Sequence, residues 1–500
     1  MIRTKIVATL GPATSSVDML VKLFEAGVDV CRINFSHGTL DSMLNTLNNV
    51  RAATEIFGSP IAVLGDLCGP KIRLGKVADI NGTGGMPVEV GDTLIIQRQP
   101  VEGRDLRVSS IYERFVDDVQ IGDRVLIEDG LLRFLVVEKQ PDELHCKCTA
   151  SGVLKSSMGI NLPKTVVSIP SITDRDWECV DWAIEQRLDY LALSFVRKPE
   201  DIMTLRDYLK DKVCDIHLIA KIEKAEGVQQ IDSIIDASDG LMVARGDLGV
   251  EMDVALVPII QKDLIRRCQL AGKPVIVATQ MLQSMIEQSS PTRAEVSDVA
   301  NAIFDGTDAV MLSGETSVGK FPIGSVLTMS HIADVTENYL VTAEKNNKNP
   351  NEARIRTNLA AGSLARGALR IVQDLDVKAV VIWTQTGGTA RVFSKHHFPV
   401  PIIALSNDTR TLRRMALHYG VVPEYMPVPS NDIGSVIEKT DELIRAKQYA
   451  KPGERVLVIA GWSPSMAGSM NGMVIHTVGD TWTAVPTAQV MRQMLKSEKE

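Results

Sequence analysis

Two carboxylates and one lysine follow neighbouring apolar segments in the middle of the chain. Glu223 lies two residues after Lys221 at the end of the segment 217–222, and Asp247 follows the segment 241–245. Side chains two residues apart point to the same side of a strand, so we expect Lys221 beside Glu223. Proteins commonly hold Mg²⁺ with a few carboxylates, water and a substrate phosphate. The pattern therefore predicts a divalent-metal site with a positive charge next to it.

Further polar side chains follow the apolar segment that begins at residue 30. Arg32, Asn34 and Ser36 alternate along it and share one face, where a core strand would carry Val or Ile. An Arg and a Lys that converge on one point favour a substrate with a phosphate group. After residue 245, the turn 246–249 (Gly-Asp-Leu-Gly) offers backbone N–H groups to an anion such as a carboxylate. We therefore expect metal-assisted phosphoryl transfer; the alternative is a set of ion pairs with a structural role.

Eight short apolar segments, each followed by a helix-length amphipathic stretch, must position these side chains. Such alternation predicts parallel βα units, and eight units predict a (β/α)8 TIM barrel. Catalytic groups in this barrel come from the C-terminal ends of the strands, where the polar residues above lie. A complete set of uncompensated polar groups at the mouth would be costly without a function. The expected strands are residues 5–10, 30–35, 62–67, 190–195, 217–222, 241–245, 274–279 and 309–313.

The spacing of these segments also predicts the domains. About 120 residues separate the third segment from the fourth, far more than a βα connection needs, and this stretch is rich in Gly turns and short alternating strands. We expect an inserted all-β lid domain, a β-barrel, over residues 70–169, within a catalytic barrel of residues 1–69 and 170–345. A polar linker near residue 346 precedes a doubly wound α/β domain of residues 346–480 and a tail of residues 481–500.

Composition narrows the class of protein. The chain has 500 residues, of which 45% are hydrophobic and 23% charged, as in globular proteins. Its net charge of −8 argues against a nucleic-acid partner. The seven cysteines are scattered and odd in number, so a disulfide framework is not expected. We find no signal peptide and no apolar run of about 18 residues, and therefore expect a cytoplasmic protein without a membrane partner.

Nine motifs in this order resemble the pyruvate kinase family. They cover the barrel segments and the edges of the insert, and the C-terminal domain fits in length and type. Together these motifs are highly specific. They are KIVATLGP (5–12), RINFSHG (32–38), DLCGPKIR (66–73), GINLP (159–163), KIEKAEG (221–227), MVARGDLGVE (242–251), ATQMLQSM (278–285), PTRAEVSDVANA (291–302) and DAVMLSGET (308–316).

The resemblance implies transfer of a phosphoryl group from phosphoenolpyruvate to ADP, which gives pyruvate and ATP in glycolysis. Glu223 and Asp247 would bind Mg²⁺ or Mn²⁺. Lys221 would stabilise the transferring phosphoryl group and the enolate oxygen, which suits a loose transition state. Arg32 would hold the substrate phosphate. The insert would close as a lid and exclude water.

The resemblance assigns the remaining substrate contacts as well. The N–H groups of Gly246 and Asp247, together with Thr279, would hold the substrate carboxylate. Thr279 would also lie where the enolate takes its proton, through water. The nucleotide side would be lined by three polar residues, Asn34, His37 and Arg73.

Two departures from the family pattern affect the cation and nucleotide sides. Many members bind K⁺ through groups that match Asn34, Ser36, Asp66 and a Thr carbonyl, with a nearby Glu. Here the Thr position is Leu67 and the Glu position is Lys71. An ammonium group could supply the charge of K⁺, so we expect activity that does not require K⁺; a solvated hinge charge is the alternative.

The second departure is Met158, which stands where the family usually carries a Lys on the nucleotide side. Either Lys155 reaches in from three residues earlier, or nucleotide binding differs. The preferred nucleotide stays open.

The C-terminal domain carries a candidate effector site. Hydroxyl groups and glycines precede a helix there and suit a phosphate; in the family this loop resembles the effector site for phosphorylated sugars or nucleotides. An ordinary strand-to-helix turn is the alternative. The candidate residues are Thr384, Thr386, Gly387, Gly388 and Thr389. Because the family is commonly tetrameric, we expect an allosteric homotetramer.

Two rival functions share parts of this pattern. A metal-dependent barrel lyase that acts on a 2-oxo acid enolate would share Arg, Glu and Asp at the strand ends, but would need neither a lid nor Lys221. An inactive metabolite-sensing homologue would use only the C-terminal domain, and the complete set of barrel residues argues against it.

Overall fold

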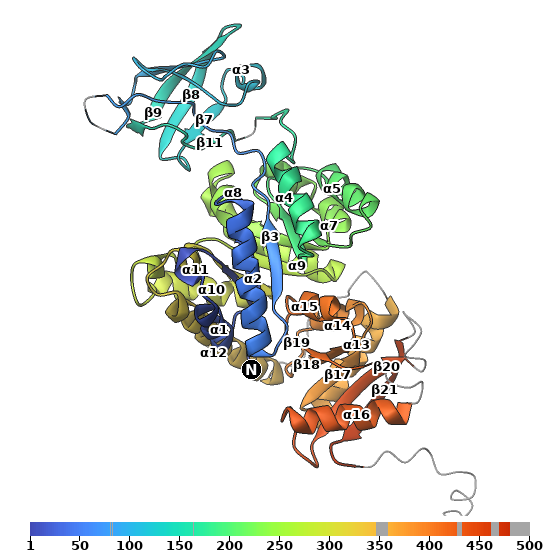
Figure 1. Ribbon diagram of the computed structural model, residues 1–500. Coiled ribbons are helices and arrows are strands. Elements are labelled where there is room, and N and C mark those ends of the chain that lie inside the picture. The colour runs from blue at the N-terminus through green and yellow to red at the C-terminus, as the bar shows by residue number, and fades with distance from the viewer. Residues whose placement is uncertain are drawn as a thin grey trace, which may run out of the picture.

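The computed structural model describes residues 1–80, 82, 84–163, 165–346, 359–427, 433–461 and 470–480. Its centre is a closed barrel of eight parallel strands in the order β1-β16-β15-β14-β13-β12-β3-β2 (Figure 1). The eight strands confirm the predicted barrel, and their ends differ from the predicted ones by at most two residues. They are β1 (Lys5–Thr9), β2 (Val30–Asn34), β3 (Ala62–Asp66), β12 (Tyr190–Leu193), β13 (His217–Ile222), β14 (Gly240–Ala244), β15 (Val275–Ala278) and β16 (Ala309–Leu312).

The alternation of side chains along each strand decides which of them reach the barrel mouth. Val30, Leu64, Ala192 and Ile219 pack together inside the barrel with side chains from the other strands. Side chains two residues further along a strand point the same way. The inner face therefore continues from an apolar layer into a polar layer at the C-terminal end of the barrel.

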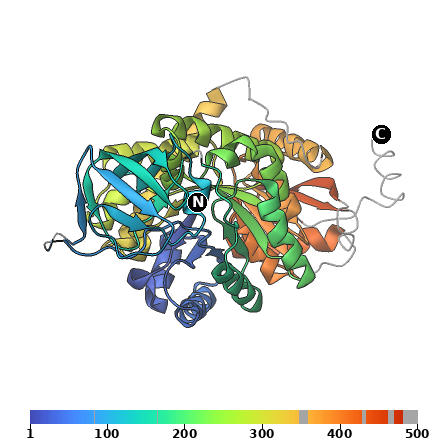
Figure 2. The ribbon, with the colours of Figure 1, turned by 90° about the horizontal axis from the view of Figure 1, so that it is seen from above.

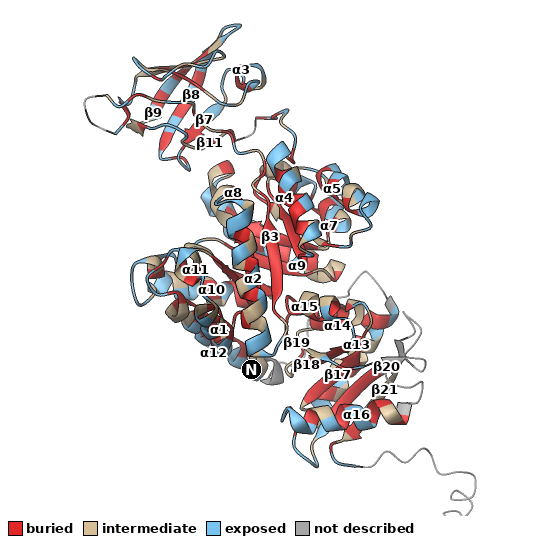
Figure 3. Cartoon of the chain, viewed as in Figure 1, coloured by how far each residue is buried: buried red, intermediate tan, exposed pale blue. Residues whose placement is uncertain are grey.

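Helices surround the barrel and turn their apolar faces to the strands, so the strands are buried on both sides (Figure 3). Thr39, Thr173 and Thr292 cap three of these helices, each by accepting a hydrogen bond from a backbone N–H of the first turn. The barrel helices are α1 (Val17–Ala26), α2 (Leu40–Phe57), α4 (Asp174–Glu185), α5 (Pro199–Asp211), α6 (Ala225–Gln229), α7 (Ile231–Ala237), α8 (Arg245–Glu251), α9 (Val257–Ala271), α10 (Arg293–Phe304), α11 (Gly314–Ser317) and α12 (Pro322–Asn346).

The all-β insert leaves the barrel between β3 and β12 and stands beyond the mouth with its own apolar core (Figures 1 and 2). Its strands form a six-stranded sheet, β11-β7-β8-β9-β5-β6, and a two-stranded sheet, β10-β4. The insert is built mainly of β-strands, as predicted, and its described strands pair in these two sheets. The elements are β4 (Met86–Val88), β5 (Thr93–Gln97), β6 (Arg107–Ser109), α3 (Phe115–Asp118), β7 (Arg124–Ile127), β8 (Leu132–Lys139), β9 (Glu143–Ala150), β10 (Gly152–Leu154) and β11 (Ile160–Asn161).

The C-terminal α/β domain has a five-stranded sheet, β19-β18-β17-β20-β21, in which only the pair β20–β21 is antiparallel. It packs below the barrel, at the end opposite the insert (Figure 1). The predicted linker beyond residue 346 and the tail 481–500 lie outside the described residues. The elements are α13 (Leu359–Leu375), β17 (Ala379–Trp383), α14 (Gly388–Ser394), β18 (Ile402–Ser406), α15 (Thr409–Met415), β19 (Val421–Tyr425), α16 (Ile433–Ala446), β20 (Arg455–Gly461) and β21 (Met470–Thr477).

Within the described parts of the chain, none of the helices has the length and apolar character needed to cross a membrane.

Candidate active site

Lys221 lies at the centre of the polar layer at the barrel mouth. Its Nζ donates to Oδ1 of Asp66 at 3.0 Å and to Oγ of Ser194 at 2.6 Å, and it lies 3.1 Å from Oε1 of Glu223. Burial by itself would lower the pKa of Lys221, but the Asp66 and Glu223 carboxylates outweigh it and raise that pKa. The ammonium group is therefore fixed in position and remains charged.

Arg32 is held in place by the same network. Its Nε donates to Oδ2 of Asp66 at 2.6 Å, and its Nη1 donates to Oγ1 of Thr9 at 2.9 Å. Burial would raise the pKa of Asp66, but the charges of Arg32 and Lys221 lower it below the ordinary value. One ionised carboxylate thus orients two cations toward the mouth, as phosphate binding requires.

Glu223 and Asp247 lie on neighbouring strand ends, after β13 and β14. Oε2 of Glu223 accepts a hydrogen bond of 2.6 Å from the N–H of Phe195. Burial raises the pKa of Glu223, and the Asp247 charge adds to this effect although Lys221 opposes it. Burial also raises the pKa of Asp247. The two acids therefore lie close enough for the Asp247 charge to act on Glu223.

The residues fit a Mg²⁺-type site rather than a closed metal cage. Among the described residues, no group of three or more His, Cys, Asp or Glu side chains is placed so that it could hold a metal ion. No described side chain or N–H group pairs with the Asp247 carboxylate. Two carboxylates completed by water and substrate oxygens are a common arrangement for Mg²⁺.

Thr279 is held in a strained conformation beside this pair. Its Oγ1 accepts from the N–H of Gly246 at 2.8 Å and donates to the carbonyl of Ala278 at 2.7 Å. Its φ is +68°, and that of Gln280 is +54°, in the left-handed region that β-branched residues avoid. Nη2 of Arg245 donates to the Thr279 carbonyl at 2.7 Å. Strain kept in this way commonly marks a functional position.

The residues predicted for K⁺ and the nucleotide are not held in one place: Asp66 belongs to the buried network around Lys221, whereas Ser36, His37 and Lys71 are exposed. Oδ1 of Asn34 accepts from the N–H of Ser36 at 3.1 Å, and His37 is exposed. Leu67 is buried, and its carbonyl accepts a hydrogen bond from Ser194. Lys71 is exposed, and its charge opposes the burial effect on the pKa of Asp247. The Lys71 ammonium therefore acts on the barrel mouth.

The insert side of the nucleotide region contains the two residues of the second departure. Met158 packs against the core of the insert, and its sulfur accepts the N–H of Lys155 at 3.2 Å. The Lys155 side chain is exposed. Nη1 of Arg73 donates to the carbonyl of Ser157 at 2.9 Å. The structure therefore places Arg73 beside the Lys155–Met158 segment and apart from the network around Lys221.

The effector candidates lie in the turn after β17 and in the first residues of α14, which begins at Gly388. Oγ1 of Thr384 accepts from the N–H of Gly387 at 3.0 Å, and Gly387 has a φ of +76°. Thr386 is exposed, and Gly388 and Thr389 are half-buried. The hydroxyl group of Thr384 is thus engaged within the loop, whereas Thr386 faces solvent.

Sequence reasoning did not single out Thr9, Ser194, Arg245 or Glu251. Thr9 and Ser194 lie two residues after the inner-face residues Val7 and Ala192, so parity alone could have indicated them. Glu251 accepts hydrogen bonds from two different domains, and no local pattern predicts such contacts.

Comparison with known proteins agrees with this geometry. The family model "pyruvate kinase, barrel domain" matches residues 1–326, and "pyruvate kinase, alpha/beta domain" matches residues 362–476. The chain is 42% identical to a pyruvate kinase of Geobacillus stearothermophilus over 96% of its length and 81% of that protein. It is 40% identical to one of Mycobacterium intracellulare, over 96% and 99%. A crystal structure of a pyruvate kinase from Cryptosporidium parvum superimposes with a TM-score of 0.86 at 34% identity, over 95% and 96% of the two chains. The chain therefore belongs to the pyruvate kinase family.

Proposed function

We propose that the barrel mouth transfers the phosphoryl group of phosphoenolpyruvate to ADP and releases pyruvate and ATP. The observation that carries this proposal is the network in which Asp66 holds Arg32 and Lys221, with Lys221 also against Glu223. Two oriented cations beside two close carboxylates provide what a phosphoryl transfer with a divalent ion needs. A lyase that acts on an enolate would form pyruvate without ADP.

The side chains divide the work between the substrate's two charged ends. Arg32 binds the phosphate, and Lys221 faces the transferring phosphoryl group and the enol oxygen. The Thr279 hydroxyl group and the N–H groups of Gly246 and Asp247 bind the carboxylate, which replaces the hydrogen bonds that Thr279 makes with Gly246 and Ala278 in the structure. The bond between phosphorus and the enol oxygen breaks, a β-phosphate oxygen of ADP forms the new bond, and the enolate takes a proton at C3 from water near Thr279.

Glu223 and Asp247 hold Mg²⁺ or Mn²⁺, which when bound supplies positive charge to the phosphoryl oxygens. Burial of both acids, together with the effect of the Asp247 charge on Glu223, would favour the binding of a cation by this pair. Asn34, His37 and Arg73 contact the nucleotide, with Arg73 on the side of the insert.

The proposed reaction does not require K⁺. Lys71 provides an ammonium group near the barrel mouth, and Leu67 replaces the threonine of members that bind K⁺. The support is electrostatic, because the Lys71 charge acts on Asp247. Asn34, Ser36 and Asp66 remain, so the paired changes Leu67→Thr and Lys71→Glu should create activation by KCl.

A regulatory site belongs to the same proposal. The turn of Thr384, Thr386, Gly387, Gly388 and Thr389 binds a sugar phosphate or a nucleotide. A panel of sugar phosphates and nucleoside monophosphates tests this, and the proposal fails if none changes activity or melting temperature.

The assembly is a homotetramer. Its support is apolar exposed surface on the outer barrel helices, where Ile259, Leu327, Val335 and Tyr339 are each more than half exposed. Light scattering with size-exclusion chromatography tests the mass.

The decisive experiment follows pyruvate formation from phosphoenolpyruvate with Mg²⁺ in buffer free of K⁺ and Na⁺. Turnover that depends on ADP and is lost in Lys221→Met supports the proposal. Pyruvate release without ADP would indicate the lyase. Strong activation by KCl would contradict the role given to Lys71 and leave the reaction itself standing.

A further inference from the structure

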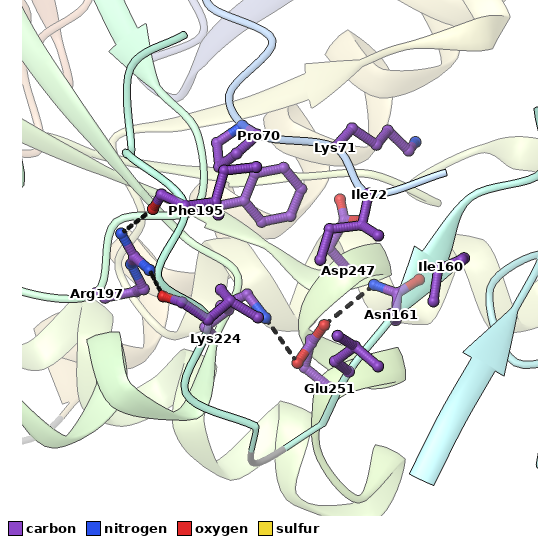
Figure 4. A pocket seen from close by; sticks show the side chains of 13 residues that line it. Pro70, Lys71, Ile72, Ile160, Asn161, Phe195, Arg197, Lys224, Asp247 and Glu251 are labelled. Atoms are coloured by element: carbon purple, nitrogen blue, oxygen red, sulfur yellow. Dashed lines mark hydrogen bonds and ion pairs between the residues drawn. The ribbon is translucent and has the colours of Figure 1, made fainter. Parts of the chain in front are cut away.

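A buried carboxylate joins the inserted domain to the barrel mouth. Oε1 of Glu251 accepts from Nδ2 of Asn161 at 3.1 Å, and its Oε2 lies 3.1 Å from Nζ of Lys224 (Figure 4). The Glu251 side chain is only 4% exposed. A buried carboxylate is costly unless hydrogen-bond donors or cations satisfy it. Asn161 from the insert and Lys224 from the barrel therefore both satisfy the same charge.

Each barrel residue of this trio is adjacent to one of the two candidate metal ligands. Glu251 follows Asp247 by four residues on α8, which places both on the same side of that short helix. Lys224 follows Glu223 directly at the end of β13. The ion pair between Lys224 and Glu251 therefore fastens α8 to the loop after β13 and helps set the separation of the two carboxylates.

Asn161 is fixed to the insert. Its strand β11 pairs with β7, with Asn161 opposite Leu126, and the N–H of Ile160 donates to the carbonyl of Ile72 at 2.8 Å. A movement of the insert relative to the barrel must therefore carry Asn161 with it. The Asn161 amide then either keeps its hydrogen bond to Glu251 or leaves Oε1 of that buried carboxylate unsatisfied.

We propose that Asn161, Glu251 and Lys224 form a latch that couples the position of the inserted domain to the spacing of the two metal-binding carboxylates. These three are positioning residues, because each acts on the metal site through Glu223 or Asp247. The metal part of this inference rests on the proposed function of Glu223 and Asp247.

Binding of Mn²⁺ to the metal-free full-length chain, followed by the paramagnetic resonance of free Mn²⁺, tests the latch without turnover. Asn161→Ala and Lys224→Met should each weaken Mn²⁺ binding roughly 10-fold, as loss of an outer-shell partner of a metal ligand does. The double variant should be weakened less than the product of the two single effects, because both act through Glu251. Lys224→Met probes the same carboxylate from the barrel side if Asn161→Ala does not fold.

Thr165→Val is the matched control. Oγ1 of Thr165 donates to Asp123 at 3.0 Å within the insert, four residues beyond Asn161. This variant removes a hydrogen bond of the insert without touching Glu251, so its Mn²⁺ affinity should equal that of the unchanged chain. Hydrogen exchange of the Ile160 N–H gives a second readout: Mn²⁺ should slow it in the unchanged chain and in Thr165→Val, but not in Asn161→Ala.

The outcomes separate the latch from the metal site. Absence of Mn²⁺ binding in the unchanged chain, or equal binding by Glu223→Gln, would refute the metal site of the proposed function. If the unchanged chain binds Mn²⁺ and the variants Asn161→Ala and Lys224→Met bind it equally well, the latch alone is overturned. Effects that multiply in the double variant would also overturn it, since they would show that the two residues act independently.

Discussion

Arg245 should control catalysis through the backbone of Thr279. Its guanidinium donates to the carbonyl of Thr279 at 2.7 Å through Nη2, while Nη1 donates to Oδ1 of Asp298 at 2.7 Å. Thr279 and Gln280 are both left-handed, at about 1–3 kcal/mol each. One hydrogen bond from a charged donor contributes about 1.5–3 kcal/mol. The free energy of the Arg245 hydrogen bond is therefore comparable to the strain energy that it opposes. Without this bond, the backbone of Thr279 should relax.

The perturbation is Arg245→Met, with Arg245→Lys as the variant that keeps the charge but loses the forked geometry. A displacement of about 1 Å at a reacting group can cost about 100-fold in rate, so kcat should fall by about two orders of magnitude in Arg245→Met. The cost in stability should be about 1 kcal/mol, since Asp298 is 39% exposed and can be hydrated.

Two assays separate positioning from general damage. Turnover gives kcat, and exchange of the C3 protons of pyruvate in D2O, followed by NMR, reports the protonation step. Both should fall in parallel, and added guanidinium should restore part of the activity of Arg245→Ala. A kcat within about 3-fold of the unchanged enzyme, or a loss matched by global unfolding, would refute the reasoning.

Three further results are expected. Burial raises the pKa of Glu223 and of Asp247, so protonation of these acids favours the folded metal-free chain. The melting temperature of the unchanged chain, relative to that of Glu223→Gln, should therefore rise as the pH falls from 7 toward 5. A difference in melting temperature that stays constant over this pH range would contradict the prediction. Leu67→Thr with Lys71→Glu should convert a K⁺-independent rate into one that KCl raises at least about 10-fold; a rate indifferent to KCl would refute the role of Lys71. Glu337→Ala should lower the free energy of unfolding, measured with denaturant, by about 3–5 kcal/mol. The reason is that this buried carboxylate accepts hydrogen bonds from the N–H groups of residues 3 and 4 and from Arg3 Nε. A loss below about 1 kcal/mol would show that these contacts are replaceable.

The barrel and its polar layer were predictable because strand parity is a local property. Arg32, Asp66 and Lys221 each stand two residues beyond an inner-face residue, Val30, Leu64 and Ile219 respectively. Alternation of side chains along a strand then requires them to face the mouth. Their convergence follows from the closure of eight parallel strands, which the count of apolar segments already indicated.

Other contacts could not be predicted, because they join segments whose relative position no local pattern determines. The insert meets the barrel through Asn161 and Glu251, 90 residues apart. The C-terminal domain meets the barrel base through the buried ion pair of Lys395 with Asp308. Strand β19 (Val421–Tyr425) contains a proline and lies at an edge of the sheet, so its sequence gives only a weak strand signal. A proline is tolerated at an edge.

The candidate site has a phosphate half and a cation and nucleotide half, and the two are held in different ways. This difference explains where the sequence departs from its family. The phosphate half rests on a network in which one buried carboxylate, Asp66, orients Arg32 and Lys221. Replacing one member would leave the charges of the others unpaired in a buried environment, which would cost several kcal/mol of stability. Lys71 is exposed and Met158 packs against the core of the insert, so both side chains stand outside this network. Leu67 is buried, but only its backbone carbonyl, which accepts from Ser194, joins the network. A change of these three side chains therefore removes no charged member of the network, whereas a change of Asp66, Arg32 or Lys221 would leave a buried charge unpaired.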